Sequence, residues 1–131
     1  MLFIAHRINT IVELEQVPKS FGVEVDARSE RGAVTLGHDP GMNGVMLEDF
    51  LKHYEHSFII INIKTEKIEK TILEILQSFN IQNFFFLDSS MSTIVQMSDM
   101  ASRKFCGRVS EFESTETITL SKYLVDWVWI D

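Results

Sequence analysis

Paired carboxylates and nearby histidines in the first third of the chain have the spacing for acid–base chemistry at a phosphate. Glu24 and Asp26 are two residues apart in an apolar segment, so on a β-strand both side chains point to the same face. Two carboxylates held side by side repel each other unless a positive charge lies between them. A divalent cation that prefers oxygen ligands, Mg²⁺ or Ca²⁺, relieves this repulsion, so the pair is predicted to bind a metal.

Asn62 and Lys64 repeat the two-residue spacing in a later apolar segment. The amide oxygen of Asn62 is predicted to be a third metal ligand, and the ammonium group of Lys64 is predicted to bind a phosphate oxygen. An alternative stays open for these residues, in which Arg7, Arg28 and Lys64 neutralise the carboxylates in an ion-pair network without a metal.

Two histidines, His6 and His38, flank the carboxylate pair in the sequence. An imidazole has an ordinary pKa near neutrality and can give or take a proton at a reacting oxygen, so two of them predict a general acid and a general base. We expect His6 to be the base and His38 the acid; the sequence does not fix this order. His53 and His56 are instead predicted to lie at a solvated helix end.

The elements that must position these side chains alternate between strands and helices. Apolar segments rich in β-branched and aromatic residues predict strands at residues 2–5, 22–26, 34–36, 58–64, 83–88, 105–109 and 125–130. Helical spacing predicts helices at residues 46–54, 66–79, 92–103 and 115–124, with Ser92 as an N-cap. Such alternation indicates right-handed β-α-β units and a parallel sheet, whose strands all end at one edge. The polar residues that follow the strands should therefore gather there.

Several conspicuous residues are predicted to pack rather than to react. Cys106 is the one cysteine and has no Cys or His cluster beside it, so it is predicted to be a packed side chain. The aromatic run Phe84-Phe85-Phe86 and the tryptophans Trp127 and Trp129 are predicted to be strand core rather than a ligand platform.

Short motifs occur in a fixed order through the first half of the chain: Ala5-His6-Arg7, Gly22-Val23-Glu24-Val25-Asp26, Gly32, Gly37-His38-Asp39-Pro40 and Asn62-Ile63-Lys64. In these motifs the chain resembles the glycerophosphodiester phosphodiesterases and the related phospholipase C-like and sphingomyelinase D-like barrels. The resemblance implies a (β/α)₈ barrel in which His6 and His38 are the catalytic pair. It further implies that Glu24 and Asp26 bind a divalent cation, and that Arg7 and Lys64 bind phosphate.

The chain departs from this family pattern at two positions and in its length. Ile8-Asn9 follows His-Arg where a glycine is usual, and Asn9 is predicted to bind substrate hydroxyls. Asn62 stands where an acidic ligand is usual, so either the metal affinity falls or another ligand such as Glu111 or Asp88 must assist. A complete barrel takes about 200–250 residues, whereas this chain has 131 and about six β/α units. We therefore expect residues 1–131 to be one incomplete barrel domain whose exposed strand edges allow self-association.

Charge and hydropathy narrow the function. A net charge of −7 disfavours nucleic acid as a partner, and no apolar run approaches the length of a membrane span or a signal peptide, so a cytoplasmic protein is expected. The predicted activity is metal-assisted attack on a small phosphodiester, by hydrolysis or by internal cyclisation. Two alternatives stay open. One is a non-catalytic or vestigial module that binds a phosphate or sugar phosphate, and the other is a metal-free sugar-phosphate lyase or isomerase on an open α/β sheet.

Overall fold

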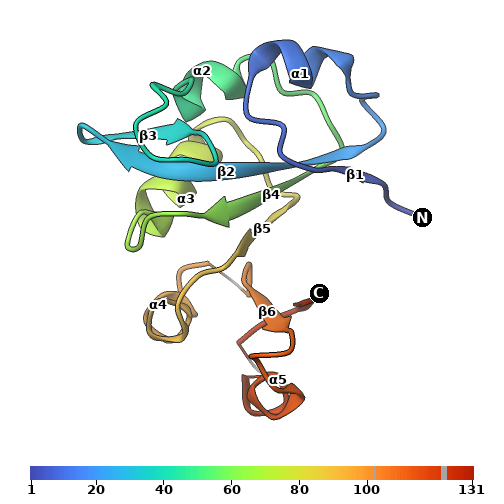
Figure 1. Cartoon of the computed structure of the whole chain (residues 1–131), viewed down its shortest axis with the longest axis vertical. Helices are drawn as coiled ribbons and strands as arrows, with labels where there is room; N and C mark the ends of the chain where they lie inside the picture. Colours follow the sequence, from blue (N-terminus) through green and yellow to red (C-terminus); the bar gives the residue numbers. More distant parts are fainter. Residues whose placement is uncertain (102, 122–123) are drawn as a thin grey trace.

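The chain folds as a mixed α/β structure with mostly parallel strands, which confirms this part of the sequence prediction (Figure 1). The computed structural model describes residues 1–101, 103–121 and 124–131. The larger sheet has the order β1-β2-β4-β5, all parallel, and β3 pairs antiparallel with the second half of β2. Its strands are β1 (Ile4–Ala5), β2 (Gly22–Glu30), β3 (Ala33–Leu36), β4 (Phe58–Ile63) and β5 (Phe84–Leu87).

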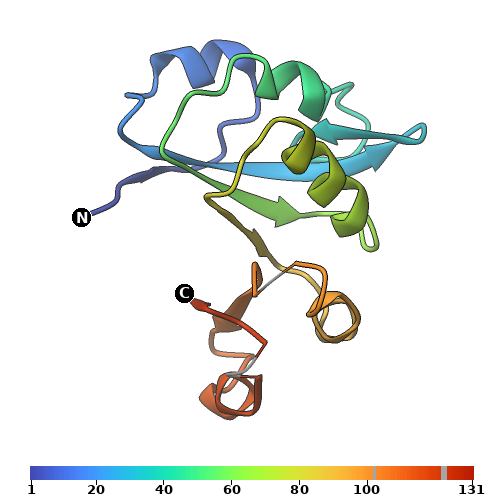
Figure 2. The same ribbon diagram turned by 180° about the vertical axis from the view of Figure 1, so that it is seen from behind.

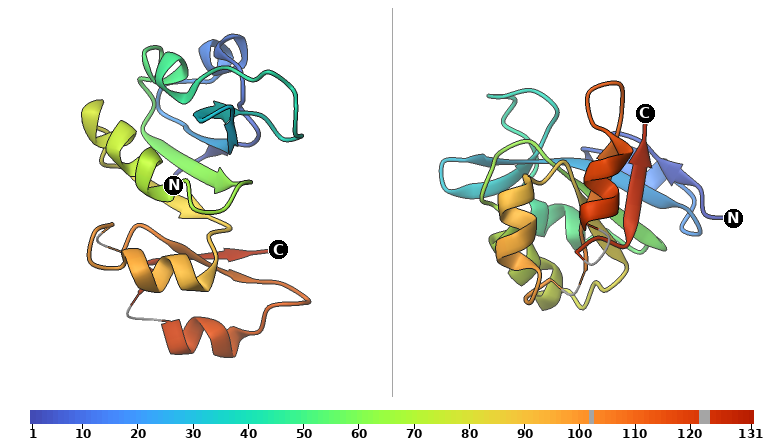
Figure 3. Two further views of the ribbon diagram at one scale, coloured as in Figure 1. Left: turned by 90° about the vertical axis from the view of Figure 1, so that its left-hand side faces the viewer. Right: turned by 90° about the horizontal axis from the view of Figure 1, so that it is seen from below.

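A smaller parallel sheet contains β6 (Cys106–Val109) and β7 (Trp127–Ile130). One isolated parallel bridge, Phe86 with Phe105, joins it to β5, and the Phe86 amide donates to the Lys104 carbonyl at 2.8 Å. In the left panel of Figure 3 the arrowheads of β4, in green, and of the strand at the C-terminus point the same way. The carboxyl ends of the parallel strands in both sheets therefore lie on one side of the molecule, whereas the antiparallel β3 runs the other way.

Helices α1 (Ile11–Gln16), α2 (Leu47–Leu51) and α3 (Glu69–Ser78) lie over one face of the larger sheet, as seen from behind in Figure 2. Helix α4 (Met91–Met97) follows β5, and α5 (Thr115–Ser121) packs on β6 of the smaller sheet. The main core is formed by apolar side chains of the helices and by alternate residues of the strands. Its fully buried members include Leu14 of α1, Phe50 of α2, Ile72 of α3, and Val25 and Ile61 of the sheet. This packing explains why β4 and β5 read as continuous apolar runs, because their opposite face is covered too.

The opposite face carries a second apolar cluster that includes Ile60, Phe85 and Cys106. Trp127 of β7 reaches across this face to Phe85 of β5 and Phe58 of β4, with ring centroids 5.0 and 5.3 Å away. Since β4 and β7 are not neighbours in either sheet, these ring contacts link the two sheets across this face. Trp127 is nevertheless 41% exposed, so its prediction as buried core was wrong, whereas Phe84-Phe85-Phe86 are all buried as predicted.

The predicted helices and strands are present with shifted ends, and one helix was missed. The predicted helix at 66–79 begins only at Glu69, because Lys67 has a left-handed backbone with φ 69°. The helix predicted at 92–103 runs from Met91 to Met97, and its N-cap is Ser90, not Ser92. Residues 102 and 122–123 of the predicted helices lie outside the described residues. The helix missed by the sequence analysis is α1, which begins with a complete capping box between Thr10 and Glu13.

Among the described residues, no helix is long and apolar enough to cross a membrane.

Cys106 is buried at 5% exposure, and this burial raises the pKa of its thiol to about 12, against a smaller opposing effect of a hydrogen bond that the sulfur accepts from the Trp129 backbone. The neutral thiol should therefore react with iodoacetamide at pH 8.5 at least about a hundredfold more slowly in the native protein than in urea. The unfolded thiol ionises from about pH 9, so any contribution of Cys106 to stability falls as the pH rises from there towards 12. Mass spectrometry of timed alkylation measures this, and equal rates in both states would contradict the buried thiol.

Candidate functional site

Strand β2 carries the two predicted metal-binding carboxylates on one face, and both are almost completely buried. Glu24 accepts hydrogen bonds at each of its oxygens. The amide nitrogen of Asn62 donates to Oε1 at 2.9 Å, and the backbone N–H of Arg7 donates to Oε2 at 2.7 Å. His6 Nε2 lies 3.5 Å from the same Oε2. Glu24 therefore holds the end of β1, the His6 ring and the side chain of Asn62 together.

The backbone turns sharply at this point. Arg7 has a left-handed conformation with φ 57°, which is uncommon for a residue with a side chain. The following amide, of Ile8, donates to the Glu24 carbonyl at 2.8 Å. The Arg7 amide also donates to the Glu24 carboxylate, so the backbone and the side chain of Glu24 both hold the chain just after β1. The strained turn is thus fixed next to the exposed ring of His6.

Asp26, like Glu24, contacts residues from several segments of the chain. It exchanges two hydrogen bonds with Asn9: the Asn9 amide nitrogen donates to Asp26 Oδ2 at 2.9 Å, and the Asp26 N–H donates to Asn9 Oδ1 at 2.8 Å. Lys64 Nζ lies 3.5 Å from Asp26 Oδ1. Both polar atoms of the Asn9 side chain are therefore engaged with Asp26, an arrangement in which Asn9 orients a carboxylate. The capping box of α1 begins at the next residue, Thr10, and fixes the backbone there.

Two buried oxygens at this site lack a hydrogen-bond donor. Within the described part of the chain, Asp26 Oδ1 and Asn62 Oδ1 have no hydrogen-bond partner, and Asp26 and Asn62 are directly paired in register between β2 and β4. The orientation of the Asn62 amide follows from its bond to Glu24, since the nitrogen must face that carboxylate and the oxygen must face away from it. The Lys64 ammonium, 3.5 Å from Asp26 Oδ1, balances the charge of that oxygen in part, whereas Asn62 Oδ1 is left without a donor among the described residues, a cost that a bound cation would relieve.

His38 follows β3 and is anchored to β2 through its backbone. The Gly37 N–H donates to the Asp26 carbonyl at 2.9 Å, and the guanidinium of Arg28 donates to the carbonyl groups of Gly37 and His38. The His38 ring is 43% exposed, and its Nδ1 is 3.0 Å from Asp39 Oδ1. A bond at Nδ1 leaves Nε2 as the nitrogen for proton exchange with a ligand.

A cavity of about 360 Å³ brings several predicted site residues together. Arg7, Asn9 and His38 line it, along with Asp39 and Met42. The His6 ring lies 3.5 Å from Glu24 of β2, and the Lys64 ammonium lies 3.5 Å from Asp26 of the same strand. Each of the eight predicted site residues therefore belongs to β2, contacts Glu24 or Asp26, or lines this cavity. The predicted ion-pair network forms only in part, because Lys64 pairs with Asp26 whereas Arg28 binds carbonyl groups.

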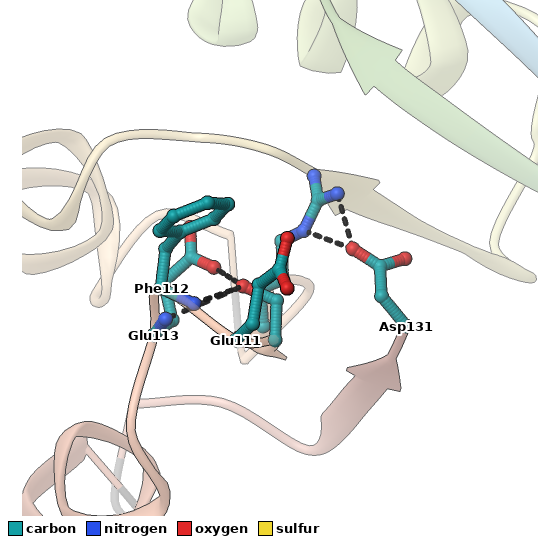
Figure 4. Close-up of a pocket in the computed structure, with 6 residues that line it drawn as sticks. Glu111, Phe112, Glu113 and Asp131 are labelled. Carbon is teal, nitrogen blue, oxygen red and sulfur yellow. Dashed lines mark hydrogen bonds and ion pairs between the residues drawn. The ribbon is translucent and has the colours of Figure 1, made fainter.

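A second polar cluster lies at the ends of β5, β6 and β7 (Figure 4). Arg108 forms ion pairs with Asp88 and Asp131, and the Trp129 indole N–H donates to Asp131 at 2.7 Å. These contacts raise the pKa of Arg108, and the Trp129 and Arg108 bonds lower that of Asp131. A cavity next to the cluster is lined by Ser110, Glu111, Phe112 and Glu113 as well as Arg108 and Asp131. Glu111 lies here, and Asp88 is held by Arg108, so neither is shown as a ligand beside Asn62.

The prediction of a solvated helix end for His53 and His56 was half right. His53 is exposed and lies 3.5 Å from Glu15. His56 is buried, and its Nε2 is 3.0 Å from the Val17 carbonyl. A ring whose neighbours come from a distant segment gives no local sequence signal of this burial.

Across the described ranges, no group of three or more His, Cys, Asp or Glu side chains has the geometry of a metal site. The donor set at β2 and β4 includes instead the amide oxygen of Asn62 beside the two carboxylates. Comparisons with protein-family models, curated proteins and solved structures found no match for this chain. The residues themselves must therefore carry any functional assignment.

Proposed function

We propose that the chain is a phosphodiesterase of the glycerophosphodiester phosphodiesterase type, with His6 and His38 as its acid–base pair. The observation that carries the proposal is that both histidine segments are bonded to adjacent same-face residues of β2. His6 and Arg7 contact Glu24, and the loop that bears His38 is bonded to the Asp26 carbonyl. One strand thus anchors both of the segments that carry these histidines.

The donor set fits a divalent cation. Asp26 Oδ1 and Asn62 Oδ1 are buried oxygens without hydrogen-bond partners in the described residues, and Glu24 lies on the same face. Carboxylate and amide oxygens are the donors that Mg²⁺ and Ca²⁺ prefer. Asp26, Asn62 and Glu24 would hold the ion, which would neutralise charge that develops on the phosphate oxygens.

The residues of the chain supply the other steps. Glu24 holds the His6 ring, and His6 takes the proton of the attacking hydroxyl, which belongs to water or to the substrate. His38, oriented by Asp39 at Nδ1, donates a proton to the leaving alkoxide. Arg7 lines the cavity beside His38, where its positive charge favours a bound phosphate. Lys64 balances Asp26 and lies near enough to contribute to the same field.

We also propose that the strands form part of a (β/α)₈ barrel. The order β1-β2-β4-β5, continued through the Phe86–Phe105 bridge to β6 and β7, is the order of successive barrel strands, with β3 as an added hairpin strand. The contact of Trp127 with Phe58 supports the curvature that closure requires.

The proposal is tested by hydrolysis of bis(p-nitrophenyl) phosphate with Mg²⁺, with Ca²⁺ or with EDTA. We expect metal-dependent turnover in the wild type and a loss of at least about a hundredfold in both His6→Ala and His38→Ala. His53→Ala is the matched control, since that histidine is similarly exposed and pairs with Glu15 instead. Turnover that survives both site substitutions would overturn the proposal.

A non-catalytic binding module is the second candidate, and the partners that the two carboxylates already have favour it. Glu24 already accepts from Asn62 and Arg7, and Asp26 is neighboured by Asn9 and Lys64. Calorimetric binding of metal or inorganic phosphate without turnover would support this candidate.

Asn62→Asp should change metal affinity and stability in opposite directions. The substitution adds a negative charge and removes the donor that bonds Glu24 at 2.9 Å. We expect the metal-free protein to lose about 1–3 kcal/mol of unfolding free energy, because two buried carboxylates then face each other. The affinity for Ca²⁺ should rise by about tenfold, since the ion gains an anionic ligand. Urea denaturation in EDTA and calorimetric titration with Ca²⁺ measure the two effects; weaker Ca²⁺ binding would contradict the assigned ligand position.

A further inference from the structure

We propose that Arg28 is a positioning residue that sets the location of His38 by clamping the backbone of the loop that carries it. The inference rests on the proposed function, because it assigns His38 the acid–base role. From the sequence, Arg28 was predicted only as a member of an ion-pair network with the carboxylates. The structure directs its side chain to carbonyl groups of the Gly37-His38 segment.

The clamp has the geometry that a guanidinium provides. Arg28 Nε lies 3.0 Å from the Gly37 carbonyl oxygen and 3.1 Å from that of His38, and Nη2 also donates to the His38 carbonyl. A rigid planar fork with several N–H groups can hold two successive carbonyls at once, which a single ammonium cannot do in the same way. The side chain therefore fixes the peptide plane that follows the His38 Cα.

The loop depends on this clamp because the backbone hydrogen bonds that anchor it to the sheet stop at Gly37, one residue before His38. The Gly37 N–H bonds to the Asp26 carbonyl, and the Leu36 N–H bonds to the Val45 carbonyl. The next contact back to β2 is from the Gly41 N–H to the Glu30 carboxylate, three residues beyond His38. Between Gly37 and Gly41, the Arg28 side chain is what holds the backbone to β2. Since the His38 ring is 43% exposed, its position is determined more by its backbone than by packing around the ring.

Position 28 also completes a pattern on β2. Glu24, Asp26 and Arg28 are spaced by two and lie on the same face of one strand. Glu24 fixes the turn at Arg7, Asp26 holds Asn9, and Arg28 holds the loop at His38. The strand thereby sets the distance between the two histidine segments, and Arg28 does for His38 what Glu24 does for His6.

The test compares Arg28→Gln and Arg28→Lys with Arg31→Gln, an exposed arginine at the nearby β2–β3 turn. Turnover of bis(p-nitrophenyl) phosphate in saturating Mg²⁺ should show kcat reduced by about a hundredfold in both Arg28 variants, with KM within about twofold of wild type. Arg31→Gln should match the wild type. Full kcat in Arg28→Lys would show that charge alone suffices and would overturn the clamp.

A second measurement keeps the proposal testable if turnover is absent. In ¹H–¹³C spectra at fixed pH, Arg28→Gln should move the imidazole resonances of His38 and leave those of His6 and His53 in place. Circular dichroism confirms that the variant is folded at the measuring temperature. If the wild type does not turn over substrate but the His38 resonances move, the proposed function fails and the positioning role stands. Unchanged His38 resonances in a folded Arg28→Gln variant would overturn the inference.

Discussion

Glu24→Gln should lower kcat/KM by at least about a hundredfold and the free energy of unfolding by about 1–3 kcal/mol. Glu24 is completely buried and accepts from Asn62 at one oxygen and from Arg7 at the other. A glutamine of the same size keeps one acceptor oxygen, but its amide group must then face one of the two donors. One buried N–H is left without a partner, and His6 loses the carboxylate beside its Nε2.

Steady-state kinetics and urea denaturation measure the two effects of Glu24→Gln. The matched control is Glu15→Gln, which removes an exposed carboxylate that also neighbours a histidine, His53. This control should keep its activity and lie within about 0.5 kcal/mol of wild-type stability. A Glu24→Gln variant with wild-type stability would show that the buried hub at β2 does not hold the strand ends together.

Phe86→Ala should destabilise the protein by about 3–5 kcal/mol, the range for removing a buried phenylalanine. Phe86 is fully buried, its ring lies 5.5 Å from Phe84 and 5.3 Å from Phe105, and its backbone forms the bridge between the two sheets. The substitution therefore opens a cavity at the junction of β5 and β6.

Chemical denaturation followed by tryptophan fluorescence reports on this junction, because Trp127 and Trp129 both lie in β7. Phe112→Ala is the control, since that side chain is 88% exposed and should change stability by less than about 0.5 kcal/mol. A loss below about 1 kcal/mol in Phe86→Ala would show that the junction is not a packed part of the core.

The sequence predicted those features of the fold that depend on periodicity. Glu24 and Asp26 share a face because strand side chains alternate, and Phe84-Phe85-Phe86 is buried because both faces of β5 are covered. The short helix α1 was missed because six residues carry little helical periodicity, although Thr10 and Glu13 form a recognisable capping box.

The partners of the site residues were much less predictable. Asn9 was expected to bind substrate hydroxyls, and its two hydrogen bonds with Asp26, which lies seventeen residues away, were not anticipated. Arg28 was expected near the carboxylates, but its side chain turns to the backbone at His38. Spacing by two places a side chain on a face, whereas its partner depends on how distant loops return to that face. The same reason hides the burial of His56 against Val17.

Few backbone hydrogen bonds join β5 to β6, and this decides how the two sheets are held together. Polar contacts that cross this junction include the Phe86 amide to the Lys104 carbonyl, the Lys104 ammonium to the Gln82 carbonyl, and the Asp88–Arg108 ion pair. Beyond these bonds, the two sheets are held together by side-chain packing, in which Phe86 lies against Phe105 and Trp127 lies against Phe58 and Phe85. Aromatic contacts therefore do at this junction what a ladder of backbone hydrogen bonds does between the other strands.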